Sequence, residues 1–348
     1  MKRILCLILC VCAVLAVSAC SPAAKEADYK LGMGVVVNMD SSATGNAQVD
    51  ATVAAVVLDA DGKIVSCRID VAQNKMAVAD GAVEAEKTFE TKMELGDRYG
   101  MANFKIDNDG NGVTKEWYEQ AKAFEAYVTG KTAAEVKAIE TKEAAGHQIA
   151  VDQTLLDAGC SMQITDFIAA VAAACEDEQG MAFKTAAEFT LGVAASTAAD
   201  ESKAATAEEN GLAAMYTDFA AAVIADGKII AALNDAIQPK ITINTAGEIV
   251  EKAYTATKRN LKEGYNMAAY GANMDPNGDG KVYEWYIQSE AFSKHVVGMT
   301  GDEVAAMETA ANSINYQMTT DEDLLAAGCT IQITAIKAVM AKAAANAR

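Results

Sequence analysis

The sequence predicts an α+β protein of two tandem homologous domains, each a small antiparallel sheet with helices packed on one face. Three observations lead to this class. Two long stretches of the chain resemble each other, and each repeat contains strand patterns first and helix patterns afterwards. The composition is 51% hydrophobic with only 6% aromatic residues, which provides aliphatic cores of ordinary size. Strands segregated from helices favour α+β over a doubly wound sheet.

The internal repeat is visible without gaps over its central part. Glu116–Thr141 aligns to Glu284–Thr309 with 14 of 26 positions identical, and Leu155–Thr165 aligns to Leu324–Thr334 with 8 of 11 identical. Two units of one family follow from this. We expect each unit to have its own core and to fold separately.

Each repeat is expected to begin with a meander of three strands. In the first repeat the strands are predicted over Leu31–Val37, Val53–Leu58 and Lys63–Ile69, and the last two form a hairpin around Asp61 and Gly62. A fourth strand is expected over 161–164, where apolar and polar residues alternate.

Helices are expected to follow the meander, over Thr91–Met101, Glu116–Val128 and Ala133–Glu140. The third opens with the capping box Thr132 and Glu135, and Thr300 with Glu303 repeats it in the second half. We expect Thr165 to cap a closing helix that extends through Ala174. The stripes of the central helices should face the core: Trp117, Ala121, Phe124, Val128, and Trp285, Ser289, Phe292, Val296.

The first twenty residues have the pattern of an export signal. Lys2 and Arg3 precede an apolar run, Ile4–Val17, that is too short to span a bilayer and ends in small residues before Cys20. The ending Val-Ser-Ala-Cys resembles the bacterial lipobox, so we expect lipidation of Cys20 and a protein anchored extracytoplasmically to the cell membrane. The predicted organisation is signal peptide 1–19, lipidated tether 20–28, repeat domain 29–175, acidic linker 176–186, repeat domain 187–343 and tail 344–348.

Charge excludes one class of partner. The chain has 29 Lys and Arg against 48 Asp and Glu, a net charge of −19. Such a protein has no basic surface for a phosphate backbone, so nucleic acid is excluded as a partner. Cys67, Cys160, Cys175 and Cys329 remain after the signal segment, and they are interpreted as small buried hydrophobic residues, with a disulfide between Cys67 and Cys160 as the alternative.

Two acidic loops predict calcium sites. In the second repeat, Asp275, Asn277 and Asp279 provide oxygen ligands at alternate positions before Gly280, as in the first half of a calcium loop. The first repeat has Asp107, Asp109 and Asn111 at the same offsets. Counted from Asp275 and Asp107 as position 1, Glu284 and Glu116 stand at position 10, whereas a calcium loop normally has its closing glutamate at position 12. The alternative is an Asx-rich turn that caps the next helix.

The chain resembles a family of lipoproteins. The runs Leu95–Met101, Glu116–Gln120 and Val128–Thr132, followed by a closing strand and helix, resemble uncharacterised tandem-repeat cell-surface lipoproteins of Gram-positive bacteria. The resemblance covers nearly the whole mature chain, and it implies a location and a repeat unit but no activity. A more distant similarity is to FMN-binding repeat lipoproteins, whose attachment motif Ser-Gly-Ala-Thr is loosely similar to Ser41–Thr44.

The sequence does not predict an enzyme. His147 and His295 are the two histidines, and they occupy different places in the two repeats, so no repeated histidine base is available. Gly130-Lys131-Thr132 lacks the first glycine of a phosphate loop. Our expectation is a lipoprotein that binds an unknown small molecule or protein without transforming it. The alternatives are an FMN-binding electron-transfer lipoprotein and a passive surface or adhesion protein.

Overall fold

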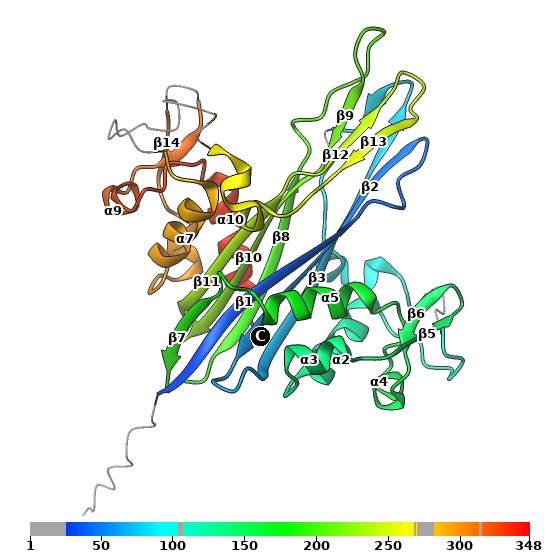
Figure 1. The fold of residues 1–348 in the computed structure, drawn as a ribbon, viewed down its shortest axis with the longest axis vertical. Coiled ribbons are helices and arrows are strands. Elements are labelled where there is room, and N and C mark those ends of the chain that lie inside the picture. Colours follow the sequence, from blue (N-terminus) through cyan, green and yellow to red (C-terminus); the bar gives the residue numbers. More distant parts are fainter. Residues whose placement is uncertain (1–25, 86, 104–106, 268, 270–281, 313–314) are drawn as a thin grey trace, which may run out of the picture.

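The structure, a computed structural model, describes residues 26–85, 87–103, 107–267, 269, 282–312 and 315–348. Antiparallel sheets form the centre of the molecule, and helices lie outside them (Figure 1). The α+β class expected from the sequence is confirmed. The predicted signal peptide and Cys20 lie outside the described residues, as do Asp275, Asn277 and Asp279 of the second acidic loop.

The first repeat begins with the expected meander, in strands longer than predicted. These are β1 (Ala27–Asn38), β2 (Asn46–Leu58) and β3 (Ile64–Ala79), to which the short β4 (Ala82–Val83) is added. Leu31 pairs with Val57, and β2 pairs with β3 along its whole length. Successive residues of a strand point to opposite faces of the sheet, and in β2 the residues on both faces are buried. This burial stabilises the long strands.

The helices of the first repeat follow the sheet. They are α1 (Lys92–Leu95) with a 3₁₀ turn η1 (Gly96–Tyr99), α2 (Trp117–Val128), α3 (Ala133–Lys137), α4 (Gln153–Asp157) and α5 (Thr165–Cys175), with the hairpin β5 (Thr141–Ala144) and β6 (His147–Ala150) between α3 and α4. The predicted stripe of α2 is buried, and the capping box of Thr132 and Glu135 is present.

Three local predictions were wrong. Residues 161–164 form no strand: the amides of Ser161 and Met162 donate to the side chain of Gln120 on α2 instead of to a neighbouring strand. Thr165 is the first residue of α5 and does not cap it, since Ile164 occupies the N-cap position. The helix predicted over Ala133–Glu140 ends at Lys137.

The second repeat has a second meander, and its far end forms an additional small sheet, in which Ala214 pairs with Lys240 as Gln48 pairs with Lys75 in the first sheet. Strands β8 (Thr190–Ala198), β10 (Tyr216–Ala225) and β11 (Lys228–Ile237) correspond to β1, β2 and β3, and Leu191 pairs with Val223 as Leu31 pairs with Val57. The additional sheet has the order β13-β12-β9 and consists of β9 (Gly211–Ala214), β12 (Lys240–Ile243) and β13 (Ile249–Ala253).

The helices of the second repeat correspond to those of the first. They are α6 (Lys258–Leu261) with the 3₁₀ turn η2 (Lys262–Tyr265), α7 (Trp285–His295), α8 (Gly301–Ala305), α9 (Glu322–Ala326) and α10 (Thr334–Ala345), with the hairpin β14 (Thr309–Ala311) and β15 (Gln317–Thr319). The capping box of Thr300 and Glu303 is present as predicted.

The two meanders pack face to face and share one core. In β2, Val53, Ala55 and Val57 are buried in a cluster that also contains Phe219 and Val223 of β10. Strand β3 runs beside β8, and β7 (Met181–Thr185) runs beside β11. The sequence does not reveal this central core, because a continuous apolar run such as Val53–Leu58 indicates that both faces of a strand are buried but not what covers them.

The helices cover the outer face of each meander. Ala54 and Val56 of β2 are buried with Phe124 of α2 and Val171 of α5, while Ala220 and Ala222 of β10 are buried under α7 and α10. In Figure 1 the helices of the first repeat lie on one side of the paired sheets and those of the second repeat on the other. The molecule therefore has helices, sheet, sheet and helices in that order.

Two further contacts join the repeats. The predicted linker contains β7, which pairs with β1 and extends the first sheet. Near the other end of the described chain, the Arg348 guanidinium pairs with the buried Glu125 of α2 at 2.8 Å. Segments of the second half thus contact the first half on its sheet edge and on a helix.

Candidate functional site

Two cavities of similar size occupy equivalent places in the two repeats. We call them cleft 1, of about 450 Å³, and cleft 2, of about 430 Å³. Every residue that lines cleft 1, except Asn108, has its counterpart in cleft 2. The matched pairs are Gln73 and Gln238, Lys75 and Lys240, Lys92 and Lys258, Tyr99 and Tyr265, Met101 and Met267, Trp117 and Trp285, His147 and Tyr316, Met162 and Ile331, and Gln163 and Gln332.

A lysine lies between two aromatic rings in each cleft. The Nζ atom of Lys92 is 4.9 Å from the ring centroid of Tyr99 and 5.7 Å from that of Trp117. In cleft 2, Nζ of Lys258 is 5.1 Å from Tyr265 and 5.4 Å from the ring of its tryptophan. Cation–π attraction holds an ammonium in such a position. Each cleft therefore presents the positive charge of this lysine between two aromatic rings.

A buried aspartate positions this lysine in each repeat. Asp70 Oδ1 accepts hydrogen bonds from the amides of Val71 at 2.7 Å and Met93 at 3.1 Å, so it holds the first turn of α1 against β3. Asp235 Oδ1 accepts from the amide of Arg259 at 3.0 Å in the same way. Burial raises the pKa of both carboxyls, and the hydrogen bonds oppose that rise.

A glutamate and a glutamine hold the next wall residues. Glu116 accepts from the amide of Met101 at 2.9 Å, and Glu284 accepts from the amide of Met267 at 3.0 Å. The phenol of Tyr99 donates to Gln73 Oε1 at 3.4 Å, and Tyr265 donates to Gln238 Oε1 at 3.1 Å. Tyrosine and methionine therefore enter both clefts with the same support.

A buried glutamine on the central helix fixes the loop that ends each cleft. Gln120 Oε1 accepts from the amides of Ser161 and Met162, both at 3.0 Å, and its Nε2 donates to the carbonyl of Lys115. Gln288 repeats this arrangement with the amide of Thr330 at 2.7 Å. Residues of these same loops line the two clefts. The hydrogen bonds to the glutamine therefore fix each loop where it meets the cavity.

The first predicted calcium loop uses its oxygens within the loop. The Asp107 carboxylate accepts from the amides of Gly110, Asn111 and Gly112, chiefly the last, which lowers its pKa. The Asn111 amide donates to Asp109 at 2.8 Å. In the described part of the chain, no three His, Cys, Asp or Glu side chains are grouped so that they could hold a metal ion. Calcium binding at either loop stays a prediction.

The flavin-like motif lies near cleft 1 but not in its centre. Cleft 1 opens into an adjoining cavity of about 380 Å³, whose wall includes Ser41. The hydroxyl of Ser42 donates to the carbonyl of Gln48 at 2.9 Å, and Thr44 is exposed. The position of Ser41–Thr44 is that of a turn beside the cavity.

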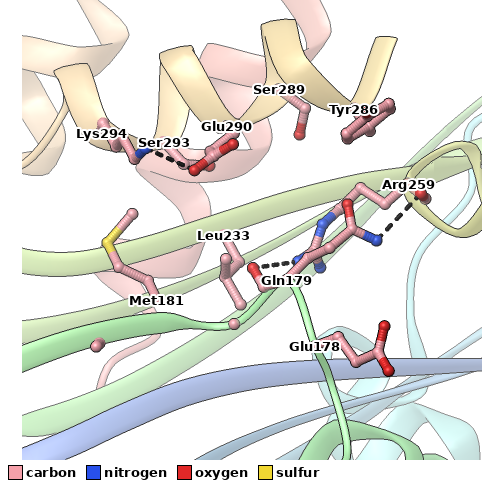
Figure 2. A pocket seen from close by; sticks show the side chains of 12 residues that line it. Glu178, Gln179, Met181, Leu233, Arg259, Tyr286, Ser289, Glu290, Ser293 and Lys294 are labelled. Carbon is pink, nitrogen blue, oxygen red and sulfur yellow. Dashed lines mark hydrogen bonds and ion pairs between the residues drawn. The ribbon is translucent and has the colours of Figure 1, made fainter. Parts of the chain in front are cut away.

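A third cavity, of about 400 Å³, lies between the repeats and not within one of them (Figure 2). It lies between the linker and α7, where Ser289, Glu290 and Lys294 of the helix project toward the strands. The Arg259 guanidinium donates to Asp177 at 3.2 Å and to the carbonyl of Gln179 at 2.8 Å, so its charge is already paired. This cavity is part of the joint between the repeats.

Sequence reasoning missed Lys92, Lys258, Gln163 and Gln332 as site residues. The available signal was that Thr-Lys-x-x-Leu-x-x-x-Tyr-x-Met occurs in both halves, beginning at Thr91 and Thr257. The tyrosines that follow the two tryptophans, Tyr118 and Tyr286, lie in different surroundings. Tyr286 lines the third cavity, while the phenol of Tyr118 hydrogen-bonds Asp97, which raises its pKa.

The described part of the chain has four cysteines, Cys67, Cys160, Cys175 and Cys329. All four are buried and form no disulfide, which agrees with their interpretation as small buried hydrophobic residues. Burial raises the pKa of Cys160 and of Cys329 to about 12. In the described part of the chain, no helix is long and apolar enough to cross a membrane.

Comparison with known proteins shows one partial similarity. A chlorophenol reductase of Desulfitobacterium hafniense is 31% identical over 134 residues, which make up 34% of this chain and 39% of that protein. The chain thus spans about two fifths of the length of the curated relative that it matches. No protein-family model and no solved structure matches the chain.

Proposed function

We propose that the protein is a membrane-anchored extracytoplasmic lipoprotein that binds flat small molecules with an anionic group in cleft 1 and cleft 2 without transforming them. The observation that carries the proposal is the duplicated lysine between a tyrosine and a tryptophan, with Lys92 and Lys258 in corresponding places. Two copies of one arrangement in a chain whose repeats differ at many other positions support a common role in binding.

The chemistry of the walls defines the class of ligand. An ammonium between aromatic rings pairs with an anionic group, and the rings and the neighbouring methionine offer apolar surface to a planar body. Lys75 and Lys240 add a second positive charge to each cleft. In a protein of net charge −19 these are local sites of positive charge, so an anion is favoured there over the rest of the surface.

FMN is a specific candidate within this class, and an electron-transfer role is the alternative function. Its isoalloxazine is planar and its phosphate is anionic, so both parts match the walls. The partial similarity to a protein named a chlorophenol reductase supports a ligand with redox or aromatic character. A passive adhesion protein, the other alternative, would bind neither FMN nor other aromatic anions in the clefts.

Titration of the purified protein with FMN and with anthraquinone-2-sulfonate tests the proposal. We expect quenching of tryptophan fluorescence, and at least a tenfold weaker affinity, about 1.4 kcal/mol, after Lys92→Met and Lys258→Met together. Lys122→Met is the matched control, because Nζ of Lys122 lies 5.0 Å from the Tyr118 ring but outside both clefts. Absence of binding, or an equal loss in the control, would contradict the proposal.

Membrane attachment is tested separately through Cys20. Two or more acyl chains anchor a protein stably because each buried methylene contributes about 0.8 kcal/mol. We expect Cys20→Ala to release the protein or to leave an uncleaved precursor. Normal processing together with retention on the membrane would show that the anchor is elsewhere.

A further inference from the structure

The clefts share their centre, but they differ at one end. The cavity that adjoins cleft 1 shares Lys92, Tyr99 and Trp117 with it and is lined in addition by Asp50 and Asp166. The strand pairing places Tyr216 at the position of Asp50, because Asn38 pairs with Asp50 as Ala198 pairs with Tyr216. The repeat alignment places Ala335 at the position of Asp166. The carboxylate pair is therefore specific to cleft 1.

One oxygen of this pair has no partner. Asp50 Oδ2 accepts a hydrogen bond from Gln48 Nε2 at 2.8 Å, whereas Asp50 Oδ1 is buried and no hydrogen bond reaches it. A buried carboxylate oxygen without a donor is unfavourable, and a donor brought by a ligand removes that cost. Burial and the charge of Asp50 raise the pKa of Asp166, and the charge of Lys92 opposes this rise, so the three groups act on one another within one cavity.

The charges of cleft 2 are arranged differently. Four aromatic residues line it, Tyr216, Tyr265, Trp285 and Tyr316, and its one lining carboxylate is the exposed Glu201. Two carboxylates of the second repeat, Asp218 and Asp235, oppose the fall that burial causes in the pKa of Lys258, but neither of them lines the cleft. A ligand in cleft 2 thus meets lysine, aromatic rings and the exposed Glu201, without counterparts of Asp50 and Asp166.

We infer that the two clefts select different ligands: cleft 1 takes an aromatic zwitterion, whose cationic or hydrogen-bond-donating group meets Asp50 and Asp166 while its anionic group meets Lys92, and cleft 2 takes a simple aromatic anion. The inference rests on the proposed function, and it adds that the repeats have diverged in specificity. Asp50 and Asp166 are then the residues that determine this specificity.

The two tryptophans allow each cleft to be observed alone, since the chain has one in each. Trp285→Phe leaves Trp117 as the reporter of cleft 1, and Trp117→Phe leaves Trp285 as the reporter of cleft 2. The probes are 4-nitrophenylalanine, a zwitterion, and 3-(4-nitrophenyl)propionate, which keeps the ring and carboxylate but lacks the ammonium. The nitrophenyl ring quenches tryptophan fluorescence, so both probes give the same readout.

We expect cleft 1 to bind the zwitterion at least tenfold more tightly than the propionate, and cleft 2 to show no such preference. Asp50→Asn with Asp166→Ala in the Trp285→Phe protein should abolish the preference while the propionate still binds. Asparagine keeps the shape of Asp50, and alanine is the residue of the second repeat.

Equal preference in both clefts, or a preference that survives the two substitutions, overturns the inference alone. If neither probe quenches either tryptophan, the proposed function fails and the inference fails with it.

Discussion

At the residue scale, glycine decides how closely the closing helices approach the sheets. A Cβ atom on Gly192 of β8 would lie 1.9 Å from the carbonyl oxygen of Ala343 on α10, and one on Gly32 of β1 would lie 2.0 Å from that of Ala174 on α5. Only the absence of a side chain permits this contact. The two glycines occupy matching places in the repeats, so the same approach is built twice.

Gly192→Ala should therefore destabilise the protein by about 1 to 3 kcal/mol, because α10 must move away from the strand. Chemical denaturation of the full chain measures the loss. Gly264→Ala is the control, since nothing lies within 4 Å of a Cβ added at Gly264. A loss of the same size in both variants would show that close packing is not the cause.

Asp218 should make stability depend on pH. Burial raises its pKa from 3.8 to about 6, although the charge of Lys258 opposes the rise. Between these values the folded state binds more protons than the unfolded state, so stability is present below about pH 4 and decreases as pH rises to about 6. Asp218→Asn removes the titrating group, so this decrease in the free energy of unfolding should be smaller in the variant. We expect the difference to be about 1 to 2 kcal/mol, because the Asp218 side chain is only partly buried.

The measurement is urea unfolding of the original protein and of Asp218→Asn at pH 4 and pH 7.5. The variant should gain stability relative to the original protein at the higher pH. A difference between the two proteins that is the same at both pH values would contradict the raised pKa.

At the element scale, α2 and α7 position the loops that end the clefts through one buried glutamine each, Gln120 and Gln288. Gln120 is 1% exposed, and its three hydrogen bonds connect the helix to the loop that ends cleft 1. A polar residue within the apolar stripe of a helix indicates a partner in another element. The partner itself, at Ser161 and Met162, becomes identifiable only when the loop is placed.

Gln120→Met should cost about 1 to 3 kcal/mol of stability because two buried amides lose their acceptor. It should also weaken ligand binding in cleft 1 and leave cleft 2 unchanged, as followed in the single-tryptophan proteins. Gln153→Met, at an exposed position, is the control and should change neither property. Equal weakening in both clefts would indicate a global effect instead.

The second acidic loop should bind calcium weakly. Without a carboxylate at position 12, a dissociation constant of about 10⁻⁴ to 10⁻³ M is expected. Calcium at ten times that value should stabilise the full chain by about 1.4 kcal/mol, which thermal unfolding resolves. Asp275→Ala with Asp279→Ala should remove the shift. An unchanged shift in that variant, or none in the original protein, would leave these residues as a helix-capping turn.

At the scale of the whole molecule, the shared core changes the expectation for the separate halves. The sequence led us to expect independent folding, but Val53, Val57, Phe219 and Val223 are buried against one another across the two repeats. A half alone would expose the inner face of its sheet to water. Cutting within 176–180 would in addition separate β7 from β1.

We therefore expect the fragments 26–178 and 179–348 to be insoluble or molten when expressed singly, and to form a folded complex when expressed together. Dye binding to exposed apolar surface and the cooperativity of unfolding measure this. Two monomeric halves that each unfold cooperatively would restore the expectation of independent domains.

The sequence by itself determined the features that depend on neighbours along the chain. The repeat, the meanders, the stripe of Trp117 and Phe124, and the capping box at Thr132 follow from periodicity and from side chains a few residues apart, and all of these are present. Export through Cys20 and calcium at Asp275 likewise come from sequence patterns and stay predictions.

The tertiary structure alone decided that the sheets face each other and that two clefts form. Lys92 and Tyr99 lie in the continuous segment α1–η1, but Trp117 follows a loop whose path no local pattern specifies. The three side chains meet because Asp70 and Glu116 accept hydrogen bonds from backbone amides of distant turns. The continuous apolar run in β2 indicates that both of its faces are buried, but the run is the same whether helices or another sheet cover them. The physical reason is that apolar burial is non-directional, so the partner of a face is selected only by the packing of the whole chain.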